Sequence, residues 1–197
     1  MDSVAHQIPL DLDVDYRHPV TVEIYPSQEE YDAHLMNPTM RGSPAVSGKY
    51  RIQMVSPRAP IRVPGITYNN RLWFAVHEFV HLVIDQISQQ TPVWLDEGVA
   101  SYEGSGSFYA RDERVRKILG NQLPSLAKLM QSYSELPSAD VYSFSVVEFI
   151  VSEYGMPALV RILRSPENLE QVLNAPLGAL EEKWHQFAAR RYRPSSQ

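Results

Sequence analysis

Cysteine is absent from the 197 residues of this chain. Its absence excludes disulfide bonds and also excludes thiolate ligands for a metal ion. Histidine, aspartate and glutamate are the strong metal ligands that remain. Any zinc ion would therefore have to be bound through nitrogen and oxygen atoms.

Long hydrophobic runs and an export leader are also missing. Although 44% of the residues are hydrophobic, the sequence does not indicate a membrane span. The first six residues, Met1–His6, have neither the basic segment nor the apolar segment of a signal peptide. We therefore expect a cytoplasmic protein, or an exported one if a leader has been removed.

Positive charge is scarce, because the net charge is −5 and the one basic cluster is Arg190–Arg193. A short basic cluster after a helix is more often a solvated helix end than a nucleic-acid site, so we expect no nucleic-acid partner. The charged fraction of 21% is ordinary for a globular protein. The length suits a single domain, which can have two lobes.

The first ninety residues predict strands together with helices. Val20–Tyr25 and Lys49–Val55 alternate in the manner of β-strands. Between them, Ser27 is a candidate N-cap for a short helix that runs to about Leu35. Four further expectations are an extended arm over residues 1–19, a loop over Asn37–Gly48, a short strand near Ile61–Val63 and a long apolar helix from about Asn70 to Gln89.

After residue 90 the sequence predicts helices alone. The first should run from Thr91-Pro92 to about Glu103, where Gly104–Ser107 is expected to end it. The others are expected over Phe108–Leu119, Pro124–Tyr133, Asp140–Tyr154, Pro157–Leu163, Pro166–Leu173 and Leu177–Arg191. We therefore predict an α+β fold with a small N-terminal β-sheet and an all-helical C-terminal half. It would form one domain over residues 20–193, with a β-containing lobe at 20–90 and a helical lobe at 91–193.

The long apolar helix contains His77 and His81 with Glu78 between them. Residues four apart lie on one helix face with their Cβ atoms roughly 5–6 Å apart, so both imidazoles can bind one ion. Glu78 can face the open coordination position and take a proton from a metal-bound water. Such a helix is normally buried, where these polar residues are costly unless paired or metal-bound. The segment therefore predicts two zinc ligands and a general base.

A catalytic zinc usually has three protein ligands and keeps a fourth position for water. Ile84 and Ile87 stand where a metzincin would continue the motif, which excludes that class. Asp85 lies on the same helix, and three successive turns of one straight helix cannot converge on one ion, so we favour a supporting or solvent-facing role for it. Glu97 is the better candidate, because it lies on the next helix, which we expect to fold back antiparallel. Gly98 beside it would let the two backbones approach closely.

A set of motifs resembles the peptidase MA-like proteins of the gluzincin group, relatives of thermolysin, over about residues 20–190. The motifs are His77–His81, Trp94–Tyr102, Leu123–Leu126 and Tyr142–Phe144 leading to Glu153–Gly155. The resemblance implies a zincin-like fold, a peptide or protein substrate and Zn²⁺ as cofactor. It also implies metal ligation by His77, His81 and Glu97, with Glu78 as general base and acid.

Two positions depart from the pattern of that family. Val80 stands where a small hydroxyl residue is usual. Ser101 stands four residues after the expected glutamate ligand, where an acid often holds a ligand histidine through its free ring N–H. Asp96, Glu103 or a backbone carbonyl would have to replace that acid.

The reaction that the resemblance implies also needs a donor for the developing oxyanion. Tyr142 is our candidate, with Tyr102 and Tyr133 as alternatives, although each can equally be a packing residue. We therefore predict a zinc metallopeptidase of the HExxH...E type. The alternative is a non-catalytic binding or regulatory module on the same fold, and a purely structural zinc site is disfavoured because such sites have four ligands and usually use cysteine.

Overall fold

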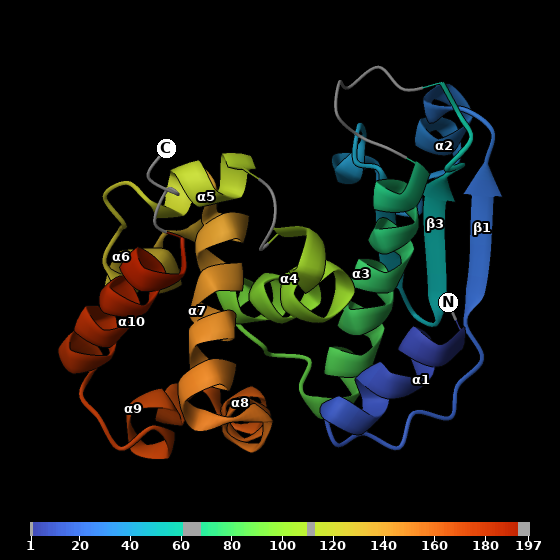
Figure 1. Ribbon diagram of the computed structural model, residues 1–197. Coiled ribbons are helices and arrows are strands. Elements are labelled where there is room, and N and C mark those ends of the chain that lie inside the picture. Colours follow the sequence, from blue (N-terminus) through green and yellow to red (C-terminus); the bar gives the residue numbers. More distant parts are fainter. Residues whose placement is uncertain (1, 61–67, 110–112, 193–197) are drawn as a thin grey trace.

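The structure is a computed structural model that describes residues 2–60, 68–109 and 113–192. A three-stranded sheet lies near the N-terminus and helices make up most of the rest, which confirms the α+β prediction. Figure 1 shows the sheet at one end of the molecule with α3 packed beside it, and α4 lies between α3 and α7 of the later helices. The strands are β1 (Thr21–Tyr25), β2 (Ala45–Gly48) and β3 (Arg51–Val55). The α-helices are α1 (Asp2–Asp11), α2 (Gln28–His34), α3 (Tyr68–Ile87), α4 (Val93–Tyr109), α5 (Glu113–Leu119), α6 (Leu126–Gln131), α7 (Ala139–Tyr154), α8 (Met156–Arg164), α9 (Leu169–Val172) and α10 (Leu177–Arg191).

The sheet has the strand order β1-β3-β2, with β1 parallel and β2 antiparallel to β3. The two predicted strands are therefore present as β1 and β3. The loop expected over Asn37–Gly48 is wrong in part, because its last four residues form β2 and Pro38–Met40 forms a 3₁₀ turn. Ala45 and Val46 are buried by their neighbours in the fold, which local sequence does not reveal. The strand expected near residue 61 lies outside the described residues.

The extended arm predicted over residues 1–19 is also wrong, since α1 occupies most of its first half. Ile8 of α1 and Leu12, which directly follows the helix, are buried in the main hydrophobic core. This burial stabilises a helix that the polar sequence alone does not indicate. The cap predicted for α2 is present, because the Ser27 hydroxyl accepts a hydrogen bond from the backbone N–H of Glu30.

Helix α4 continues to Tyr109, so the break predicted at Gly104–Ser107 is wrong. Gly104 lies against the backbone of α3, and Gly98 lies against the backbone of α7 near Ser143. The close approach expected at Gly98 is therefore present, but its partner is α7. Figure 1 shows α4 crossing α3, so the expected antiparallel return is also wrong. The glycines permit close helix contacts here and do not end the helix.

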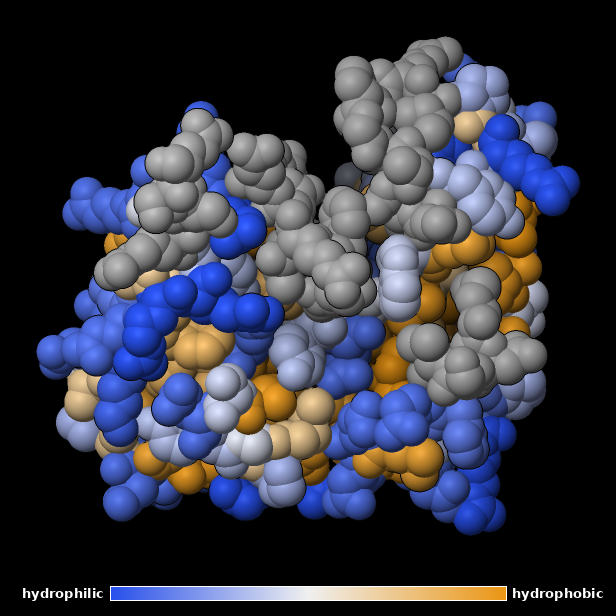
Figure 2. Space-filling view, viewed as in Figure 1, coloured by the Kyte–Doolittle hydropathy of each residue, from blue (hydrophilic) through white to orange (hydrophobic). Residues whose placement is uncertain are grey.

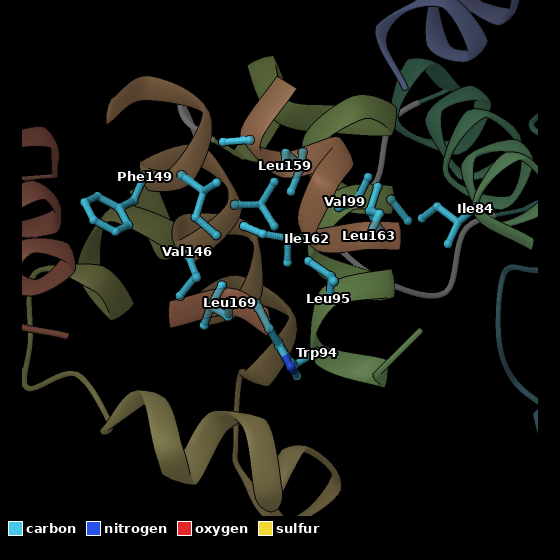
Figure 3. Packing of buried hydrophobic residues seen from close by; sticks show 14 of the residues in the cluster. Ile84, Trp94, Leu95, Val99, Val146, Phe149, Leu159, Ile162, Leu163 and Leu169 are labelled. Carbon is cyan, nitrogen blue, oxygen red and sulfur yellow. The ribbon is translucent and has the colours of Figure 1, made fainter. Parts of the chain in front are cut away.

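The helical half is packed around α7, which contacts α4, α6, α8 and α10. Trp184 of α10 is buried and donates a hydrogen bond to Ser145 of α7. The predicted helices over Asp140–Tyr154 and Leu177–Arg191 match α7 and α10 closely. Figure 3 shows the core where α4 meets α7 and α8, with the labelled residues Leu95, Val99, Val146, Leu159, Ile162 and Leu163 gathered between these helices. Phe149 points toward α10, where its ring packs on Phe187.

Other helix boundaries differ more from the predictions. The helix expected over Phe108–Leu119 is present only as α5, and residues 110–112 lie outside the description. The helix expected over Pro166–Leu173 is a 3₁₀ turn followed by the short α9. Among the described helices, none is long and apolar enough to cross a membrane.

The crossing of α4 and α7 predicts a specific loss of stability for Gly98→Ala. A Cβ atom at this position would lie 2.8 Å from the Ser143 carbonyl oxygen and 2.9 Å from Val147 Cγ2. We expect a net loss of roughly 1–2 kcal/mol in the free energy of unfolding, because the overlap outweighs the better helix propensity of alanine. Urea denaturation measures it. Gly178→Ala is the control, since a Cβ atom there meets nothing within 4 Å; equal effects of the two variants would contradict the packing argument.

Candidate metal centre

Helices α3 and α4 bring the three predicted ligands together. His77 and His81, one turn apart on α3, have their Nε2 atoms 3.2 Å from each other. Glu97 of α4 places one carboxylate oxygen 3.3 Å from Nε2 of His77 and the other 4.0 Å from Nε2 of His81. One ligand atom from each residue lies within 4.8 Å of the others, and among the described side chains no second group of three comes as close.

The donor set of this group fits a catalytic zinc ion. Two imidazole nitrogens and one carboxylate oxygen are a common ligand set for zinc in hydrolases, with the fourth position left for water. The side chains of His77, His81 and Glu97 keep 20%, 16% and 34% of their exposure, so the group is open to solvent on one side. A closed structural site would instead surround the ion with four protein ligands.

Asp96 holds the second histidine in place. Its Oδ1 atom lies 2.9 Å from Nδ1 of His81. A carboxylate at this distance favours the proton on Nδ1 and leaves Nε2 to face the other two ligands. Of the candidates to replace the acid that the family often has after the glutamate, Asp96 is the one whose carboxylate contacts a predicted ligand histidine. It precedes Glu97 in the sequence, whereas the family acid follows the glutamate. Ser101, where the family often has an acid, is buried on α4.

Negative charge dominates the electrostatics of the group. Burial by itself would lower the pKa of His81, but the hydrogen bond and charge of Asp96, with the charges of Glu97 and Glu78, raise it to about 9. Burial likewise opposes ionisation of Glu97, but the hydrogen bond from His77 and the nearby histidine charges lower its pKa. The group therefore favours a positive charge between its side chains.

Two further acidic residues lie on α3 near the predicted ligands. Glu78 is half-buried, and its charge contributes to the raised pKa values of His81 and of Tyr31 on α2, after the larger effect of burial on the tyrosine. Its carboxylate therefore lies near the ligands and also near α2. Asp85 is exposed and does not belong to the ligand group. Partial desolvation and the charge of Asp96 raise its pKa. Its supporting or solvent-facing role stays a prediction.

The three tyrosines considered as oxyanion donors all pack against hydrophobic residues. Tyr142 of α7 is half-buried between the two clusters of the helical half. Tyr102 of α4 has its ring centroid 6.4 Å from that of Phe144. Tyr133 lies in a 3₁₀ turn against the main core. The role of Tyr142 as oxyanion donor stays a prediction.

Glu103 has a different neighbour from the one expected. It was a candidate partner for a ligand histidine, but burial, aided by the negative charge of Asp11 on α1, raises its pKa to about 7. Sequence reasoning missed this pair, because it treated residues 1–19 as an arm outside the domain. Only the packing of α1 brings Asp11 close to α4.

The sequence matches a family model described as Peptidase MA superfamily over residues 5–189. The chain belongs to the peptidase MA superfamily. This membership confirms the resemblance seen in the motifs and is consistent with the gluzincin group. The superfamily match begins within α1, so it includes most of the segment that was expected to be an arm. No curated protein matches the chain.

The hydrogen bond between Asp96 and His81 predicts that Asp96→Asn weakens zinc binding. The variant keeps the shape of the side chain but loses the charge that orients the imidazole. We expect a zinc dissociation constant roughly 10–100 times larger, measured by competition with a chromophoric chelator. Asp85→Asn is the matched control, because it removes a nearby charge without a hydrogen bond to a ligand. Equal losses in both variants would show that zinc affinity depends on nearby negative charge and not on the hydrogen bond to His81.

The raised pKa of Glu103 predicts a pH-dependent effect of Glu103→Gln on stability. Folding favours the protonated carboxyl group, so its contribution is present below the usual glutamate pKa and is lost as the pH rises through about 7. Between pH of about 5.5 and about 8.5, the wild type should lose roughly 2 kcal/mol of unfolding free energy relative to the variant. Denaturant titrations at both pH values measure this. The exposed Glu182→Gln is the control, and a Glu103→Gln difference that does not change with pH would contradict the assignment.

Proposed function

We propose that this member of the peptidase MA superfamily is a zinc metallopeptidase of the HExxH...E type. The observation that carries the proposal is the convergence of His77, His81 and Glu97 within 4.8 Å, with Glu78 on the same helix beside them. Superfamily membership supports a peptidase of this metal-dependent kind. The ligand set and its partial exposure support catalysis in preference to a structural site.

Each residue of the group has a distinct role in the proposed reaction. His77, His81 and Glu97 would hold Zn²⁺, which when bound lowers the pKa of a water molecule towards ~7 and polarises the peptide carbonyl. Glu78 takes a proton from the attacking water on a carboxylate oxygen. The water oxygen bonds to the carbonyl carbon and the C–N bond breaks. Glu78 then returns the proton to the leaving amine, so one water is consumed and a carboxyl group and an amine are formed.

The sheet offers a place for an extended peptide substrate. Strand β2 is at one edge of the described sheet, and both β2 and β3 contact α3. An edge strand can add a peptide strand through main-chain hydrogen bonds. Figure 2 shows hydrophobic side chains gathered over the part of the molecule built on the sheet and α3. A peptide paired with β2 would run along α3, where Glu78 is located.

The oxyanion formed during attack would need a hydrogen-bond donor from the protein. Tyr142 is our proposal for it, on the family resemblance of its segment. It lies next to Ser143, whose carbonyl oxygen is at the crossing of α4 and α7, so it is on a part of α7 that packs against the ligand-bearing helix. The proposed donor and the ligand Glu97 are thus on two helices in direct contact.

Replacement of the general base tests the proposed reaction. Glu78→Gln should lower the rate of cleavage of a denatured protein or a peptide library by roughly 10²–10⁴-fold, because proton transfer is lost. Mass spectrometry of the products measures cleavage. The variant should keep about one zinc per chain, since glutamine replaces a residue outside the ligand set. The exposed Glu153→Gln of α7 is the control and should cleave like the wild type.

Removal of the third ligand tests the zinc site separately. Glu97→Ala should bind much less zinc than the wild type under elemental analysis, because two histidines alone do not complete the site. A wild type that binds no zinc after zinc addition and removal of the excess would overturn the proposal. Cleavage that persists unchanged in Glu78→Gln would overturn the role of Glu78 and leave the ligand assignment intact.

A further inference from the structure

We propose that Gly104 is a positioning residue for the metal ligand His77, an inference that rests on the proposed zinc site. A Cβ atom at position 104 would lie 2.8 Å from Cα, 2.9 Å from the backbone nitrogen and 3.1 Å from Cβ of His77. All three atoms belong to the backbone or its first side-chain carbon, so they cannot move aside as the end of a flexible side chain does. Gly104 therefore sets how close α4 comes to α3 at His77.

The same face of α4 also reaches the imidazole of that histidine. Glu97 and Gly104 are seven residues apart, which is about two helical turns, so they lie on one face. Glu97 meets Nε2 of His77 at 3.3 Å, and Gly104 meets its backbone. Helix α4 thus contacts both the imidazole and the backbone of His77. A change in the separation of α3 and α4 at Gly104 alters the position from which the imidazole reaches the metal.

The displacement that a side chain would cause exceeds what a zinc site tolerates. Carbon atoms in ordinary contact are about 3.5–4.0 Å apart, so a Cβ atom 2.8 Å from Cα of His77 requires a shift of roughly 0.7 Å or more. Metal–ligand distances are held to about 0.2 Å. Since Asp96 bonds His81 to α4 at 2.9 Å, the shift should tilt α3 and open the His77 end.

The course of α4 independently indicates that position 104 serves packing. Glycine and serine are poor helix formers, yet α4 remains helical through Gly104–Ser107 and ends only at Tyr109. A glycine in a helix interior costs about 1 kcal/mol relative to alanine, and the close approach of two backbones at position 104 accounts for that cost. Here the neighbouring backbone belongs to a proposed metal ligand, so the packing reason and the functional one coincide.

The test compares wild type, Gly104→Ala and Leu180→Ala for zinc affinity and for thermal unfolding of the metal-free proteins. Leu180 is buried on α10, which packs against α6 and α7, so its truncation lowers stability away from the ligands. We expect Gly104→Ala to bind zinc at least about 10-fold more weakly, while Leu180→Ala stays within about twofold of wild type. The absorption spectrum of the Co²⁺-substituted Gly104→Ala protein should also differ from that of the wild type.

Three results would overturn the inference. Zinc affinity of Gly104→Ala could equal that of the wild type, or Leu180→Ala could lose as much affinity as Gly104→Ala. Gly104→Ala could also fail to fold where Leu180→Ala folds, which would make the glycine a requirement of the fold. A wild type that binds no zinc would overturn the proposed site itself, and the wild-type measurement distinguishes that failure from the other three.

Discussion

The close crossing of α4 over α3 is the constraint on which the site depends. It brings a carboxylate of one helix to two imidazoles of the other, with contacts of 3.2–4.0 Å among them. Such a crossing is possible because Gly104 has no side chain toward His77. Gly98 permits a second close crossing with α7, so one helix joins the sheet side of the molecule to its helical core. The polar group is thereby fixed to both parts.

Apolar packing behind the polar group holds this arrangement. Val80, Val83 and Ile84 of α3 are buried in the same cluster as Leu95 and Val99 of α4. Figure 3 shows Leu95 and Val99 next to residues of α7 and α8, with Ile84 on the neighbouring α3. Burial of such side chains contributes about 1.5–3 kcal/mol each. That stabilisation offsets the cost of holding several ionisable groups together at a half-buried position.

Charge explains why these residues suit a cation. Glu78, Asp96 and Glu97 lie near the two histidines. The hydrogen bond with Asp96, together with these three charges, raises the pKa of His81 despite its burial. A bound divalent cation is often the largest local charge in such a site and compensates the nearby carboxylates. Asp96 has a second effect, since its contact with Nδ1 leaves Nε2 of His81 facing His77 and Glu97. Position and protonation of the His81 imidazole are therefore set by the same contact.

Prediction from sequence succeeded where local signals were strong. Helices α7 and α10 have long periodic or apolar patterns, and the end of α7 at Gly155 follows from its positive φ of 81°. Prediction failed for α1, β2 and the second half of α4. Each of these elements depends on contacts with residues far away in the chain. Propensity and periodicity describe only neighbours in sequence, so they cannot report such contacts.

By itself the sequence determined the candidate ligands, because the spacing of His77, Glu78 and His81 on a helix and the absence of cysteine leave few possible ones. The place of Glu97 on the next predicted helix, together with the family resemblance, made it the candidate third ligand. Only the tertiary structure showed which acid contacts His81, which edge strand packs beside α3, and that Gly104 lies against the backbone of His77. These three depend on distances between helices and strands that fold from separate parts of the chain. Such distances are set by packing, and a linear sequence does not display them.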